Sequence, residues 1–418
     1  MFASPTIPQY RFFQKDLLDA MGTLAVLFAV TLISPAVGIC LSILFFMGNP
    51  TRQSAVTCSL AFGLAMALIT HGIEYKSPTD MTRWMQECEY YYGLPLDSVF
   101  TSLNQDHANL IVWNLWCWCV GNTGDLYLLQ ASAAFFGYWM LVWLIMDACA
   151  NSRTSRAAFL ALLLFALLAV PMEPIVRSVR STIGCIICAV AFYIGANGSK
   201  SRSIKALLLI VLACLIHKAM VVALAIWALQ PLITSNPKKM AMLFGVGVYA
   251  VITISDILLS IGLFNGIPFL KESLDLANFY TEGTQWDQNQ VTDPLQNIDH
   301  FARVAMLILM LVRIGLTRQT GNLVALTFVG TAAVVAMELA LVNVGLRFQY
   351  IPILLGCVLL LDNGGRERAM ARGWAIPLDF ALFILALVAT AISCRWFIPM
   401  FNYLEVAKSA IIFPLALL

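Results

Sequence analysis

Residues 172–227 read MEPIVRSVRSTIGCIICAVAFYIGANGSKSRSIKALLLIVLACLIHKAMVVALAIW, and they combine apolar runs of membrane-spanning length with charged residues. The stretch holds two long apolar runs, separated by the basic turn NGSKSRSIK at 197–205. His217 and Lys218 interrupt the second apolar run. Ionisable groups are costly inside a bilayer and mark functional sites where they occur. The stretch therefore predicts membrane-spanning helices with a polar site between them.

The composition of the whole chain is that of a membrane protein. Its 418 residues are 60% hydrophobic and 11% charged, with a mean hydropathy of +0.83 and a net charge of +2. A soluble domain carries about 25% charged residues. Nothing in this charge indicates a nucleic-acid partner, and the four histidines lack neighbours at zinc-ligand spacing. We predict an all-α polytopic membrane protein with one domain, residues 1–418, and about 11–12 transmembrane segments.

The outward-facing parts are predicted from the polar segments. Apolar runs at 21–48 and 54–72 predict the first spans, because about twenty residues cross a bilayer. Two polar loops follow later in the chain, at 73–124 and 261–300. Within the first loop, residues 107–120 are too short to cross and are rich in tryptophan, which is typical of an interfacial or re-entrant helix.

The orientation is predicted from the basic turns, which favour the cytoplasmic side. All of them share one side if residues 204–235 form a re-entrant hairpin with its tip at His217 and Lys218. Both polar loops and both termini then face outward. A single long tilted helix over 204–235 is the alternative, and it would place the polar loops inside.

Three charged residues at the start of the opening stretch point to an anion site. Glu173, Arg177 and Arg180 are spaced i, i+4, i+7, which predicts one face of a helix that begins near Pro174. A helix N-terminus favours an anion, and a guanidinium adds a bidentate fork for phosphate oxygens. The alternative is that these arginines snorkel to lipid headgroups or pair with nearby acids.

Two further arginines are expected to open outward-starting helices. Arg347 follows Gly345, and Arg303 follows an acidic segment. Both would add guanidinium groups to the same phosphate site. The acids Asp256, Glu338 and Asp379 lie in spans and are interpreted as members of structural pairs.

His217 and the first polar loop supply the remaining candidates. His217 fits a general base or a substrate ligand, and the alternative is a core histidine bonded to a backbone carbonyl. Asp80, Arg83 and Glu87 share one face if their segment is helical, although a solvated face has the same pattern. Trp84 could stack on a sugar ring, but interfacial belts have this composition too.

The order of these motifs resembles the EpsG/Wzy-type bacterial polysaccharide polymerases. Asp80-Met81-Thr82-Arg83-Trp84 resembles the motif of their first outer loop, with Trp84 where a tyrosine is usual. VRSTIG at 179–184 and ACLIHKAM at 213–220 resemble the central arginine and histidine motifs, with Lys218 where a small residue is usual. Tyr280 in the second outer loop and Arg347-Phe348 complete the resemblance.

The resemblance implies a GT-C-like glycosyltransferase of the bacterial inner membrane, acting in O-antigen or exopolysaccharide synthesis. Its substrates would be oligosaccharides on undecaprenyl pyrophosphate at the periplasmic face, used without a metal or other cofactor. A chain-length-regulating co-polymerase is an expected partner. His217, Arg180 and Asp80 would be catalytic, and the substrate would be bound by Arg177, Arg347, Arg83, Lys218, Glu173, Tyr280 and Arg303.

Other functions fit parts of this pattern. An O-antigen ligase shares the carrier lipid, but usually has one larger periplasmic loop. A transporter or flippase would use the intramembrane charges to line a passage, although inverted repeats are expected there and none is apparent. A membrane O-acyltransferase is less favoured because its charged motif would lie early in the chain.

Overall fold

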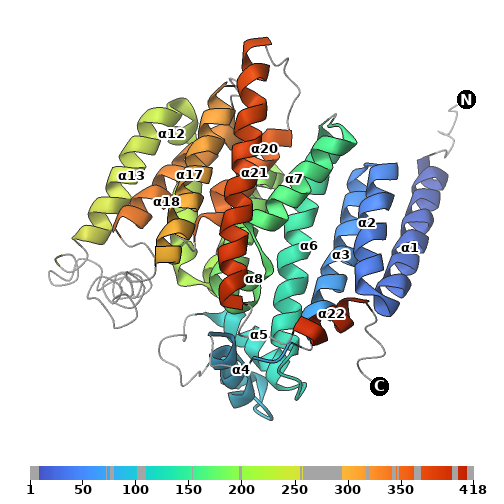
Figure 1. Ribbon diagram of the computed structural model, residues 1–418. Coiled ribbons are helices and arrows are strands. Elements are labelled where there is room, and N and C mark those ends of the chain that lie inside the picture. Colours follow the sequence, from blue (N-terminus) through green and yellow to red (C-terminus); the bar gives the residue numbers. More distant parts are fainter. Residues whose placement is uncertain are drawn as a thin grey trace, which may run out of the picture.

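The computed structural model describes the chain apart from residues 1–8, 72, 76–79, 101–109, 153, 197–199, 255–256, 258–293, 317–320, 341–344, 346–347, 362–368, 398–402 and 412–418. Every regular element in this described part is a helix (Figure 1). Five of the described helices are long and apolar enough to cross a membrane, and shorter apolar helices accompany them. The protein is thus an all-α polytopic membrane protein, as predicted.

The helices follow one another in this order along the chain: α1 (Gln9–Ile33), α2 (Pro35–Gly48), α3 (Arg52–His71), α4 (Asp80–Tyr90), η1 (Leu96–Val99), α5 (Ile111–Gly121), α6 (Leu128–Asn151), α7 (Arg156–Ala169), α8 (Met172–Arg177), α9 (Val179–Ala196), α10 (Lys200–Ile216), η3 (Lys218–Met220), α11 (Val221–Ala228), α12 (Gln230–Ser235), α13 (Pro237–Thr253), α17 (Pro294–Leu316), α18 (Asn322–Ala340), α20 (Tyr350–Leu361), α21 (Ala369–Phe397) and α22 (Tyr403–Ile411).

The first apolar run does not form the predicted single span. It is divided into α1 and α2 at Pro35, which is well placed to start a helix because its missing N–H is not needed there. Gly38 lies so close to Thr31 that no side chain would fit between them. The two helices lie side by side, and α1 begins at the end of the bundle away from α4 (Figure 1). The prediction that both termini share the side of the polar loops is therefore wrong for the N-terminal helix.

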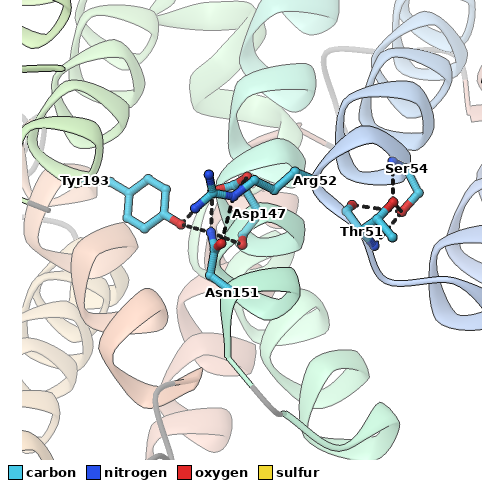
Figure 2. Close-up of polar contacts among 6 residues, drawn as sticks. All are labelled: Thr51, Arg52, Ser54, Asp147, Asn151 and Tyr193. Carbon is cyan, nitrogen blue, oxygen red and sulfur yellow. Dashed lines mark hydrogen bonds and ion pairs between the residues drawn. The ribbon is translucent and has the colours of Figure 1, made fainter. Parts of the chain in front are cut away.

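A polar network joins the helices at the end away from α4. Arg52 donates from Nε to Asn151 Oδ1 at 2.8 Å, and Tyr193 donates its hydroxyl to Asp147 Oδ2 at 2.7 Å (Figure 2). Asn151 Nδ2 links the two pairs, at 2.9 Å from Asp147 Oδ2 and 3.1 Å from Tyr193 Oη. The start of α3 and the ends of α6 and α9 thus meet here. Basic turns follow α6 and α9, so these turns gather at one end, as predicted.

The chain folds back at His217. Gly195, near the end of α9, is approached by Ala206 of α10 and by Trp227 of α11. Gly184, near the start of α9, is approached by Met220 in the turn between these helices. Residues before and after His217 therefore run in opposite directions along the same helix. The rings of Trp227 and Phe192 stack with centroids 6.2 Å apart, which holds the returning arm on α9.

Candidate functional site

A break at Ser178 separates residues that were expected to share one helix face. Helix α8 ends at Arg177, Ser178 has φ −104° and ψ 47°, and α9 begins at Val179. Thr182 bridges the break by donating from Oγ1 to the Pro174 carbonyl at 2.8 Å. The prediction of one continuous helix is wrong. As a result, Arg177 and Arg180 enter different polar clusters.

Arg180 lies on two tryptophans that come from other helices. Its guanidinium carbon is 3.9 Å from the ring centroid of Trp84 and 5.5 Å from that of Trp113. The two indoles meet edge to face at 5.5 Å, and both are buried. Arg83 also places its guanidinium 4.2 Å from the Trp84 centroid. Since Trp84 is only 5% exposed, its ring serves the arginines and is not open to a sugar.

The predicted helical face in the first polar loop is present in α4. The helix buries Met81, Trp84, Met85 and Cys88 and packs against α5. Arg83 Nη2 lies 3.5 Å from Asp80 Oδ1, and Glu87 Oε2 accepts a long hydrogen bond of 3.4 Å from Trp113 Nε1. The charges of all three α4 residues act on Arg180. We call this group the Arg180 cluster: Asp80, Arg83, Trp84, Glu87, Trp113 and Arg180.

His217 forms the break between α10 and η3. Its Nδ1 accepts a hydrogen bond of 3.2 Å from the Ala219 N–H and so caps the short helix that starts with Lys218. Met220 of the same helix touches Gly184, which lies one helical turn beyond Arg180 on α9. The fold-back therefore brings the histidine segment to the part of α9 that begins with Arg180.

Arg303 belongs to a second, buried group. Helix α17 begins at Pro294, so the prediction that Arg303 opens a helix is wrong. Its Nε lies 2.7 Å from Asp299 Oδ1, and its Nη2 donates to Ser393 Oγ at 3.1 Å. Glu173, which is 3.0 Å from Arg177 Nη1, acts electrostatically on Arg303 as well. We call this group the Arg303 cluster: Glu173, Arg177, Asp299, His300, Arg303 and Glu338.

The comparison with known families decides the identity of the chain. A model of the EpsG family matches residues 83–403, a range that holds Arg83, Arg180, His217 and Arg303. The chain belongs to the EpsG family. Membership supports a polysaccharide polymerase in general, and with it glycosyltransferase chemistry on a lipid-linked oligosaccharide. No curated protein and no solved structure matches the chain.

The structure of this EpsG-family protein also tests the interpretation of the intramembrane acids. Asp379 is a structural partner, since Arg313 Nε lies 3.0 Å from its Oδ1, as predicted. Glu338 faces His300, with 3.8 Å between Oε2 and Nδ1, which is within ion-pair range but longer than a hydrogen bond. Asp256 lies outside the described residues. The cost of an acid inside a span is the signal by which the sequence could have singled out Glu338 as a candidate site residue.

The place of some residues in the site was not predicted from the sequence, and other predicted site residues lie outside the part of the chain that the structure describes. The sequence placed Glu87 on one helical face with Asp80 and Arg83 and Trp113 in a tryptophan-rich segment, but nothing local indicates that either residue lies near Arg180. Tyr280 and Arg347 lie outside the described residues, so their predicted roles stay predictions. Within the described part, no three His, Cys, Asp or Glu side chains converge as metal ligands.

Proposed function

We propose that this protein transfers a growing glycan from an undecaprenyl-pyrophosphate carrier to a lipid-linked oligosaccharide repeat unit at the periplasmic face. Transfer would invert the anomeric centre and need no metal. The observation that carries the proposal is the Arg180 cluster, in which a guanidinium at the start of α9 is held by two buried indoles.

The cluster suits a pyrophosphate leaving group. The anomeric carbon–oxygen bond breaks readily only if the charge that develops on the pyrophosphate is neutralised. Arg180 lies in the first turn of α9, where free N–H groups and the helix dipole also favour an anion. Arg83 brings a second guanidinium to the Trp84 indole, and Asp80 Oδ1 lies 3.5 Å from Arg83 Nη2. In this proposal Arg180 binds the pyrophosphate, Arg83 supports it, and Asp80 orients Arg83.

The hydrogen bond at His217 favours a phosphate-binding role over that of a general base. A neutral imidazole that accepts a backbone N–H at Nδ1 carries its own proton on Nε2. Nε2 can then donate to a phosphate oxygen but cannot take a proton from a sugar hydroxyl. Lys218 follows directly and would add positive charge. Arg347 would bind the same pyrophosphate, and Tyr280 the sugars.

The fold-back at His217 supports a re-entrant hairpin in a GT-C-like membrane enzyme. Helix α10 spans 17 residues, whereas the returning arm is divided into η3, α11 with 8 residues and α12 with 6, so no single helix of that arm is long enough to cross a bilayer. The tip would carry His217 and Lys218 into the outer half of the membrane, next to Arg180. The opposite end, with its basic turns, would face the cytoplasm.

The test is elongation by purified protein supplied with synthetic polyprenyl-pyrophosphate oligosaccharide in EDTA. Wild type should form a ladder of longer glycans. Arg180→Ala should lose at least about 100-fold in rate, the size of effect seen when a group that stabilises developing charge is removed. Arg202→Ala, on α10 at the end where the basic turns gather, is the matched control and should elongate normally.

A normal ladder from folded Arg180→Ala would refute the assignment of the pyrophosphate site. Transfer to a different acceptor glycolipid, with no elongation of repeat units, would select an O-antigen ligase. No product with or without divalent metals, combined with movement of the lipid-linked oligosaccharide across vesicle membranes, would select a flippase.

A further inference from the structure

Glu338 is a buried carboxylate that does not belong to the Arg180 cluster. It lies near the end of α18, its side chain is 2% exposed, and neither carboxylate oxygen has a hydrogen-bond partner among the described residues. Such a group is costly to bury and calls for an explanation. His300 Nδ1, at 3.8 Å from Oε2, is too far away for a hydrogen bond and also has no such partner in the described part.

The neighbouring arginine has an unused donor. Arg303 donates from Nε to Asp299 and from Nη2 to Ser393, but its buried Nη1 has no acceptor among the residues described. Arg303 lies within electrostatic range of Glu338, and no hydrogen bond joins Nη1 to either carboxylate oxygen. One side therefore offers an N–H and the other offers carboxylate oxygens. A hydroxyl group complements both, because it accepts one hydrogen bond and donates another.

We propose that Glu338 is the general base that activates the acceptor sugar hydroxyl, which Arg303 Nη1 holds in place. This inference rests on the proposed function. The hydroxyl proton passes to Glu338 as the oxygen forms its bond to the anomeric carbon of the donor sugar. The bond between that carbon and the pyrophosphate oxygen breaks, and the polyprenyl pyrophosphate leaves with the electron pair. No oxidant, reductant or further reactant is needed.

The arrangement of the two clusters fits this division of roles. Glu173 is paired with Arg177 and lies within electrostatic range of Arg303. Arg177 precedes the break at Ser178, and Arg180 follows it. The break at Ser178 therefore separates Arg177, a member of the Arg303 cluster, from Arg180 of the proposed pyrophosphate site. His217 cannot serve as the base at Nε2, for the reason given above, so the reaction needs a proton acceptor from another element.

The test compares Glu338→Gln with Glu338→Asp in the elongation assay. Gln keeps the shape but cannot take a proton, so kcat should fall by about 10²- to 10⁴-fold. Asp keeps the carboxylate and should retain more activity than Gln. Binding of the lipid-linked donor, measured by its thermal stabilisation of each variant, should stay as in wild type. Asp379→Asn is the matched control: the Asp379 carboxylate is half-exposed and pairs with the buried Arg313, Asn keeps an oxygen that can accept from Arg313 Nε, and kcat should stay within about twofold.

The outcomes separate the two proposals. Elongation by Glu338→Gln within threefold of wild type overturns the base assignment alone. A rank order with Gln more active than Asp also overturns it, because a packing role tolerates the isostere better than the shortened acid. If Glu338→Gln cannot be purified folded, Glu338→Ala, which also lacks the carboxylate, decides: elongation within threefold of wild type overturns the assignment. No elongation by the wild-type protein overturns the proposed function together with this inference.

Discussion

Trp84 positions Arg180, so replacing Trp84 should slow catalysis. The guanidinium carbon of Arg180 lies 3.9 Å from the Trp84 centroid, and the indole is only 5% exposed. A cation–π contact is worth about 2 kcal/mol when it is desolvated, and 1.4 kcal/mol corresponds to a factor of about ten. If Trp84→Leu frees Arg180 from this position, kcat/KM should fall by roughly 30-fold. Trp84→Phe keeps a smaller aromatic face and should lose only several-fold.

The assay is elongation of the lipid-linked oligosaccharide, normalised to the amount of folded protein. Normalisation is needed because replacing a buried indole with a smaller side chain also lowers the stability; full truncation to alanine costs about 3–5 kcal/mol. Trp143→Leu is the matched control, since Trp143 packs edge to face on Tyr193 near the opposite end of the bundle. It should change the melting temperature but leave kcat/KM per folded molecule unchanged.

A double-mutant cycle provides the decisive result. If Trp84 acts mainly through Arg180, Trp84→Leu should cost little further once Arg180→Ala is present, because its remaining cation contact is with the largely exposed Arg83. Independent effects, in which the losses of the two single variants multiply in the double variant, would refute the role of Trp84 in positioning Arg180. A loss in the Trp143→Leu control as large as that in Trp84→Leu would point to general destabilisation instead.

Two further predictions concern the fold-back and the orientation. Gly195→Ala should lower the melting temperature and the elongation rate, because a Cβ there would overlap Trp227 of the returning arm, at an overpacking cost of about 1–3 kcal/mol. Gly247→Ala is the control and should change neither quantity, because a Cβ there meets nothing within 4 Å. Equal effects of the two variants would contradict the packing of Trp227 on Gly195. The orientation is tested in a background in which the exposed Cys40, Cys119 and Cys394 are replaced. Tyr92 and Lys239 are both exposed, so a cysteine at either position can react with a membrane-impermeant thiol reagent. Tyr92→Cys should be labelled in intact spheroplasts and Lys239→Cys only after permeabilisation, and the reverse pattern would overturn the orientation.

The sequence alone determined the class of fold and the location of one break in the apolar structure, the fold-back at His217. Long apolar runs must pair their own backbone groups in a bilayer, so they form helices wherever they are placed. His217 and Lys218 indicated the fold-back for a different reason: ionisable side chains are costly inside an apolar run, so their presence suggests that the run is interrupted there. The order of the arginine and histidine motifs was enough to indicate the EpsG family, which the match over residues 83–403 confirms.

Only the tertiary structure decided which charges meet. Trp84 and Arg180 are far apart in sequence, and nothing local to either residue predicts that an indole would hold the guanidinium. The break at Ser178 divides arginines whose spacing suggested one face, and Arg303 is buried well inside α17. A sequence shows that a buried charge needs compensation. Which partner supplies it depends on how the helices pack, and packing is a property of contacts between distant parts of the chain.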